Sequence, residues 1–168
     1  MPSESAHLGL VMHNVEVLRG LCERSGHHDW VSVVAFYTAL HAVEALFARD
    51  KPDNRAHGQS HENRERLLKS NPRYKNIYKH YRPLQGIATV ARYLEDPRGR
   101  ATRKVSREIE CFDEYLSERE VRTEVVGHRL HQVLGSTAHL LSKIRGAKRS
   151  ADVIREADRA LRNLPEPG

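Results

Sequence analysis

Apolar residues between Trp30 and Phe47 recur at alternating steps of three and four positions. That spacing lines one face of a helix. The row consists of Val33, Phe36, Leu40, Val43 and Phe47. A second row beside it turns from apolar to polar along the chain: Trp30, Val34, Tyr37, His41 and Glu44. Because two adjacent faces need cover, the segment predicts a helix inside a bundle.

The same periodicity predicts helices over most of the remaining chain, and no segment alternates at the period of a strand. Ser60 and Ser150 are expected N-caps, Asp29 is expected to cap the central helix, and Pro83 is expected to kink or restart its helix. Together with the central helix, the predicted segments are 5–24, 61–69, 73–95, 105–144 with weak points at Gly127 and Gly135, and a last short helix ending near 164. The fold class is therefore all-α. We expect a bundle of about five to seven helices, with one long up-down hairpin and shorter helices around it.

The chain of 168 residues has the length of a single domain. Residues 96–104 read as a basic linker, since they include proline and glycine and no apolar side chain larger than alanine. This linker divides a core at about 5–96 from C-terminal helices at 105–164.

The chain is basic, with a formal net charge of +6, and arginine outnumbers lysine by 21 to 7. Arginine suits planar, bidentate contacts to phosphate, so the balance permits RNA binding. A genome that encodes arginine freely explains the same composition. The cluster Arg98, Arg100, Arg103, Lys104 and Arg107 is either an RNA-contacting or acidic-partner surface or a solvated linker.

Cys22 and Cys111 follow no metal-site spacing, and free thiols suit a reducing compartment. No apolar run has the length expected of a membrane span, and the first residues lack the pattern of a signal peptide. We expect a cytoplasmic protein that does not contact a membrane.

Three separated stretches share one family pattern: AFYTALHAVEALFAR in the central helix, SHENRERLL after it, and YRPLQGIATVARYLED later. Together they resemble the HEPN domain, a small helical bundle found in toxin–antitoxin, phage-defence and nucleotide-related systems. The matching positions are Phe36, Tyr37, His41, Ala45, Leu46, His61, Arg92 and Tyr93. The resemblance covers about residues 30–96. It implies a homodimer that acts on RNA, possible antitoxin or defence-system protein partners, and no cofactor.

Many HEPN proteins are metal-independent ribonucleases that carry Arg-x(4–6)-His. The histidine transfers a proton while the arginine stabilises charge on the phosphate. Three pairs here have the spacing: Arg55/His61, Arg73/His80 and Arg122/His128. Chance alone predicts roughly four in a chain of this composition. We select Arg55 and His61 as candidate catalytic residues, because they lie beside the signature helix and His61 begins a predicted helix.

Further candidate binding residues are His41, His57, Arg64, Arg92, Tyr93, Arg100 and Arg103. The segment from Arg55 to Arg66 is either a phosphate-binding or catalytic surface or a solvated polar loop. His41 and Glu44 are either metal ligands or, as we expect, part of a buried hydrogen-bonded group with Tyr37 and His61. The function predicted is a HEPN-type RNA-binding protein or ribonuclease. The alternative is a catalytically inactive module that binds a protein partner or a nucleotide.

Overall fold

Six helices form a bundle in the part of the chain that the computed structural model describes, residues 3–50, 60–95 and 109–164. They are α1 (Glu4–Cys22), α2 (His28–Arg49), α3 (His61–Ser70), α4 (Lys75–Tyr93), a continuous rod, and α7 (Lys148–Arg162). The rod consists of α5 (Glu118–Glu120), the π-helical segment η4 (Val121–Leu130) and α6 (His131–Ser142). Two short 3₁₀ turns, Pro72–Tyr74 and Phe112–Glu114, precede α4 and the rod. These described segments contain no strand, which confirms the all-α prediction.

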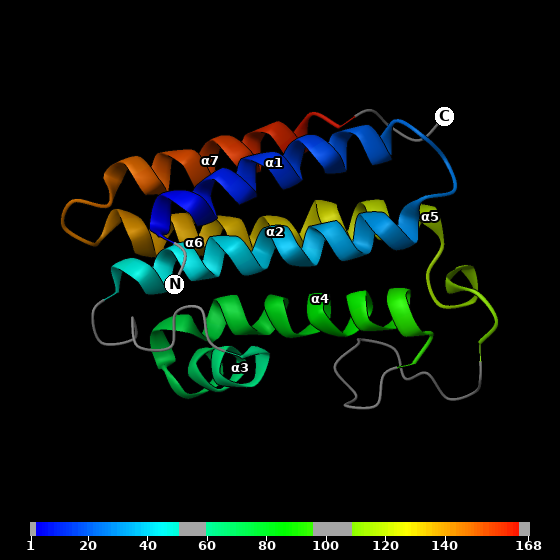
Figure 1. Ribbon diagram of the computed structural model, residues 1–168, viewed down its shortest axis with the longest axis horizontal. Helices are drawn as coiled ribbons and strands as arrows, with labels where there is room; N and C mark the ends of the chain where they lie inside the picture. Colours follow the sequence, from blue (N-terminus) through cyan, green and yellow to red (C-terminus); the bar gives the residue numbers. More distant parts are fainter. Residues whose placement is uncertain (1–2, 51–59, 96–108, 165–168) are drawn as a thin grey trace.

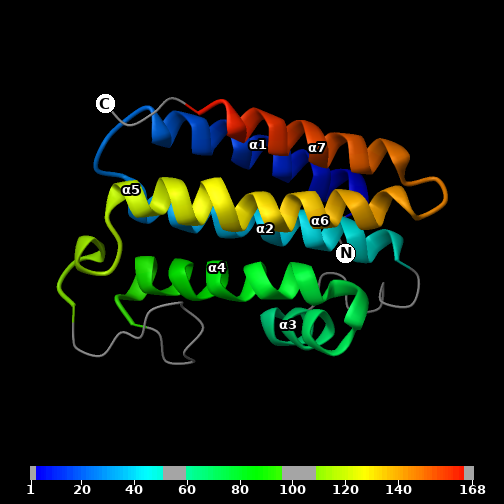
Figure 2. The ribbon, with the colours of Figure 1, turned by 180° about the vertical axis from the view of Figure 1, so that it is seen from behind.

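The helices lie in three layers (Figures 1 and 2). α1 and α7 form one outer layer, α2 and α6 the middle layer, and α4 with α3 the other side. α1–α2 and α6–α7 are hairpins, and their turns contain Gly26 and Gly146 at φ values of +81° and +80°. Glycine adopts this left-handed conformation without a steric penalty. Because α7 packs against α1 and α6 packs against α2, the C-terminal helices share one core with the N-terminal ones.

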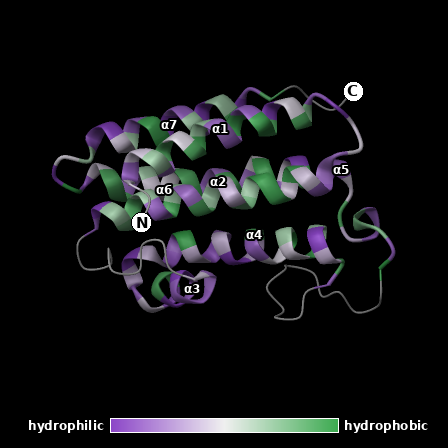
Figure 3. Ribbon diagram, in the orientation of Figure 1, coloured by the Kyte–Doolittle hydropathy of each residue, from purple (hydrophilic) through white to green (hydrophobic). Residues whose placement is uncertain are grey.

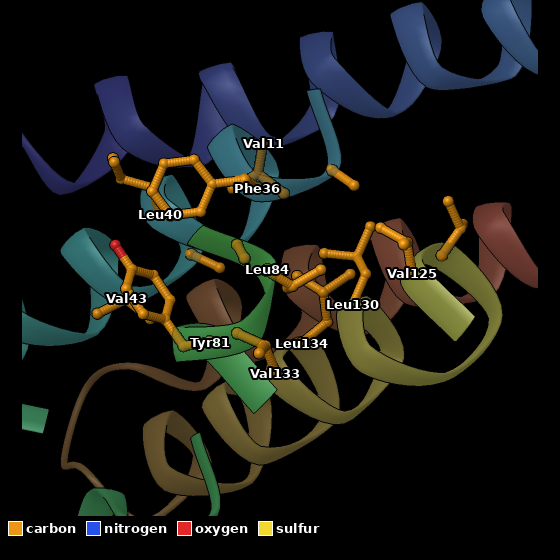
Figure 4. Close-up of a cluster of buried hydrophobic side chains, with 14 of the residues drawn as sticks. Val11, Phe36, Leu40, Val43, Tyr81, Leu84, Val125, Leu130, Val133 and Leu134 are labelled. Carbon is orange, nitrogen blue, oxygen red and sulfur yellow. The ribbon is translucent and has the colours of Figure 1, made fainter. Parts of the chain in front are cut away.

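The first row of α2 is buried as predicted, with exposed fractions from 0% at Phe36 to 7% at Leu40. α1, α4, α6 and η4 all contact α2, so side chains from four directions meet it. Figure 4 shows Phe36, Leu40 and Val43 facing Tyr81 and Leu84 of α4 and Leu130 and Leu134 of the rod. α3 is the most hydrophilic helix in Figure 3, and only Arg64 and Leu68 of it are buried.

α2 also bears on the expectation that no segment could cross a membrane. By length and composition it is apolar enough to do so, contrary to that expectation, but 78% of its apolar window is buried inside the bundle. A core helix covered on several sides has the same composition as a membrane span.

Several helix boundaries differ from the predictions. The N-cap of α2 is His27 and that of α7 is Ala147, whereas Asp29 and Ser150 lie in the first turns. Asp29 instead accepts a hydrogen bond from the backbone of Trp30, and the Ser150 hydroxyl donates to Glu4. Ser60 caps α3 as predicted, and α4 continues through Pro83.

The rod begins later than predicted. Residues 105–108 and the linker at 96–104 lie outside the described residues, and 109–117 hold only a 3₁₀ turn. Ser117 and Glu120 form a capping box that starts the helix after this turn. Gly127 does not end it but lies in the π-helical segment, where a Cβ would come within 3.0 Å of the Arg122 carbonyl oxygen. A larger residue would crowd this wider turn of the backbone.

Leu40→Ala should lower the free energy of unfolding by about 2–5 kcal/mol, because it removes buried methyl groups from the centre of the core. Urea denaturation measures this loss. Leu10→Ala is the matched control, since Leu10 is 39% exposed, and its effect should stay within about 0.5 kcal/mol. Equal losses in the two variants would contradict the central position of α2.

Candidate functional site

The candidate residues that the structure describes are divided among three places. Arg55, His57, Arg100 and Arg103 lie outside the described residues and stay predictions. His61 and Arg64 lie on α3, His41 faces α1 from α2, and Arg92 with Tyr93 ends α4. The described candidates therefore do not converge on one pocket.

A buried ion pair joins α3 to the centre of the bundle. Nε and Nη2 of Arg64 both lie 2.5 Å from Oε1 of Glu44, and the two side chains are 6% and 1% exposed. Taking two charges out of water is costly, so each depends on the other. Arg64 was predicted as a ligand-binding residue, but its guanidinium is used here to hold α3 against α2.

His61 lies at the exposed first turn of α3, next to this pair. Its Nδ1 is 3.2 Å from Nη1 of Arg64, and its ring lies 5.9 Å from that of Phe36. A guanidinium only donates hydrogen bonds, so Nδ1 must accept and the ring proton is on Nε2. In this state Nε2 can donate to a phosphate oxygen. General-base catalysis through Nε2 would require His61 to turn away from Arg64.

Tyr81 of α4 lies beside the same pair. Burial raises the pKa of its hydroxyl strongly, and the positive charge of Arg64 opposes this effect. The hydroxyl therefore stays neutral at physiological pH. Its ring is fully buried and packs against Phe36 with the centroids 5.5 Å apart.

The polar row of α2 has three different partners rather than a single group around His61. Glu44 binds Arg64, His41 pairs with His7 through Nδ1 atoms 3.1 Å apart, and the Tyr37 hydroxyl lies 3.5 Å from Nη1 of Arg92. Burial lowers the pKa of His41; the Glu44 charge raises it, and that of Arg64 lowers it. Across the described segments, no three His, Cys, Asp or Glu residues are placed to hold a metal ion.

Arg92 and Tyr93 form an exposed aromatic and cationic surface with Tyr37 and Trp30. The Arg92 guanidinium lies 5.0 Å from the centroid of the Tyr93 ring, within the range of a cation–π contact. Tyr93 is 60% exposed and Trp30 is 56% exposed. Trp30 and Tyr37 are seven residues apart on α2 and so share one face. We call these four residues the aromatic surface.

The other two Arg/His pairs bring their histidines together and keep their arginines apart. The rings of His80 and His128 meet edge to face with centroids 5.1 Å apart, across the contact between α4 and η4. Arg73 instead binds Asp50 at 2.9 Å, while Arg122 donates to the Cys22 carbonyl oxygen and to Glu118. Both arginines therefore stabilise the fold at a distance from the histidines. Sequence spacing had not suggested the contact of His80 with His128.

His80 is only 4% exposed, and its Nδ1 has no hydrogen-bond partner among the described residues. Burial lowers its pKa to about 4, and the nearby basic side chains of His128, Lys79 and Arg129 act in the same direction. The ring therefore stays neutral over the physiological range.

Arg64→Met should lower the free energy of unfolding by about 3–5 kcal/mol, because it leaves the buried Glu44 carboxylate without its counter-charge. The double variant Glu44→Leu/Arg64→Met should recover most of this loss. Urea denaturation measures both, with exposed Arg155→Met as the control. A double variant as unstable as Arg64→Met would contradict the coupling of the two charges.

Acid should destabilise the protein through His80. Its pKa is about 4 in the folded state and near 6.5 when exposed, so the unfolded chain binds more protons between these values. The free energy of unfolding should therefore fall as the pH drops from 6.5 to 4. Thermal melts across this range should show a shallower slope for His80→Gln than for wild type. An unchanged slope would show that His80 is not the group responsible.

Comparisons with family models, curated proteins and solved structures found no match to this chain. The likeness to HEPN domains therefore rests on the motif residues of the sequence. The geometry itself supplies two kinds of feature, which are arginines engaged with carboxylates, with Arg64 among them buried, and an exposed aromatic surface.

Proposed function

We propose that this chain is a HEPN-type RNA-binding protein of a toxin–antitoxin or phage-defence system that acts in the cytoplasm as a homodimer. The aromatic surface would bind single-stranded RNA. The observation that carries this proposal is the Arg92 guanidinium over the exposed Tyr93 ring and near the Tyr37 hydroxyl, with the exposed Trp30 two turns before Tyr37 on the same face of α2.

Single-stranded nucleic acids bind where aromatic rings stack on bases and cations follow the backbone. Tyr93 and Trp30 expose more than half of their surface, and Arg92 supplies a positive charge between Tyr37 and Tyr93. The net charge of +6 adds a general attraction to RNA. Every base has an aromatic face that can stack on a ring, so we expect little dependence of the affinity on base identity.

Binding without cleavage fits the described arginines better than catalysis does. Arg64 and Arg122 are each engaged with a carboxylate of the chain and are largely shielded from solvent. A catalytic arginine has to stabilise the charge that builds up on a phosphate. Each of these guanidiniums would lose a buried or partly buried partner by turning to RNA.

Metal-independent RNA cleavage through Arg55 and His61 is the second candidate function. It is favoured by the exposed position of His61 in the first turn of α3, where the helix dipole attracts phosphate. A protein that binds RNA but leaves it intact, with or without a chelator, would exclude this candidate.

The proposed homodimer rests on the sequence resemblance to HEPN domains, which implies a homodimer. Both free cysteines suit a reducing compartment: Cys22 is buried and Cys111 is exposed without a disulfide. Light scattering gives the mass of the particle. If the aromatic surface serves the dimer instead, Tyr93→Ala will release monomers.

Tyr93→Ala should weaken binding of a short single-stranded RNA by about tenfold, because one base–aromatic stack is worth about 1–3 kcal/mol. Tyr93→Phe keeps the ring and should bind like wild type. Fluorescence anisotropy of labelled RNA measures the affinity, which should fall steeply with salt. Equal binding by Tyr93→Ala and wild type at every salt concentration would contradict the role of this surface.

Trp30 is the only tryptophan, so its fluorescence reports directly on the surface. RNA should quench this emission in wild type, and Leu10→Ala, a change of an exposed apolar residue on α1, should leave the quenching intact. RNA binding without any change in Trp30 emission would place the RNA elsewhere.

A further inference from the structure

A second surface lies along the exposed side of α6, where the beginning of α4 and the end of α7 border an open groove. Its volume is about 390 Å³, within the usual size of small-molecule sites. Figure 2 shows α6 in front of α2 with α7 and α4 on either side. None of its lining residues belongs to the aromatic surface, so an occupant would not need that surface.

The groove is lined by basic and neutral polar groups without a carboxylate. Arg73 lies in the 3₁₀ turn before α4, and Arg162 lies on α7. His131 and His139 come from α6. A guanidinium presents five N–H donors in a planar fork, which suits the oxygens of a phosphate. The lining therefore selects for an anion.

Two carboxylates outside the lining hold these donors in position. Asp50 is 5% exposed and binds Arg73, with Oδ2 2.9 Å from Nη1, and it also accepts a hydrogen bond from Tyr74. Asp158 binds Nη2 of Arg162 at 3.1 Å and Nδ1 of His131. Each guanidinium keeps further N–H groups beyond those contacts. This arrangement fixes the cations and leaves donors for a ligand.

His131 is placed by this pairing. Burial would raise the pKa of Asp158, but the hydrogen bonds and charges of His131 and Arg162 outweigh it and lower that pKa. Asp158 is therefore an ionised acceptor, so Nδ1 of His131 carries a proton. His131 lines the groove, and Nε2 is the ring nitrogen that Asp158 does not use.

Neutral groups complete the site. Asn76 donates to the Ser136 hydroxyl at 2.6 Å and so joins α4 to α6 across the groove. Gly135 also lines it, and a Cβ there would meet no atom within 4 Å. The space above Gly135 is open, and Leu140 offers an apolar contact beside it.

We propose that this groove binds the phosphate of a small phosphorylated molecule, a phosphate monoester of about mononucleotide size. Arg162 and His131 contact the phosphate, while His139 and Leu140 contact the organic part. The site goes beyond the proposed RNA binding, because it uses other residues on α4, α6 and α7. RNA backbone phosphate shares part of this chemistry, and the experiment separates the two sources.

The test is calorimetric titration of the full chain with AMP, and separately with inorganic phosphate. AMP should bind saturably and more tightly than phosphate. Arg162→Gln should weaken AMP binding about tenfold, the usual value of one hydrogen bond to a charged group. Arg155→Gln changes an exposed arginine of the same helix outside the groove and should bind AMP like wild type. Absence of saturable binding by wild type overturns the proposal.

Gly135 provides a second test that does not remove charge. Gly135→Leu should abolish AMP binding by filling the groove, while the melting temperature stays equal or rises because glycine disfavours a helix. Unchanged AMP binding by this variant overturns the proposal. So does displacement of AMP by single-stranded RNA without a terminal phosphate, because the groove would then hold RNA backbone. Trp30 quenching in the same samples reports RNA binding independently, so either proposal can fail alone.

Discussion

The need to cover α2 on nearly every side organises this structure. Its apolar row is 0–7% exposed, and α1, α4, α6 and η4 each contact part of its circumference. The burial ends only along the row that starts at Trp30, so this row is where α2 reaches the surface. At the far end of the same row, Glu44 enters the core as a charge and requires Arg64 as its partner. One helix therefore determines both the layers of the bundle and the attachment of α3.

The sequence predicts this architecture because the hydrophobic period carries most of the information about helices. The buried row of α2, the cap Ser60 of α3 and the absence of strands from the described segments are all confirmed. The missed boundaries depend on local competition. Ser117 forms a capping box that the periodicity in 105–116 does not reveal. The Ser150 hydroxyl donates a hydrogen bond to Glu4 and does not cap its own helix.

The partners of polar residues are much harder to predict, because they depend on which helices become neighbours. The sequence places Tyr37, His41 and Glu44 on one face correctly. It does not show that Arg92, His7 and Arg64 arrive from three different helices to bind them. His80 and His128 are 48 positions apart and meet only because α4 packs against η4. Arg55, His57, Arg100 and Arg103 stay predictions from sequence alone.

The location of the arginines separates structure from function in this chain. Where a guanidinium meets a carboxylate in the interior, as Arg64 meets Glu44, it stabilises packing and is not available to a ligand without a loss of stability. Arg92 differs because it lies on an aromatic ring at the surface, and Arg162 differs because its side chain is 62% exposed beside an open groove. A basic composition alone does not distinguish these positions. Burial does, and it directs attention to two surfaces on different helices, one suited to stacked bases and the other to a compact anion.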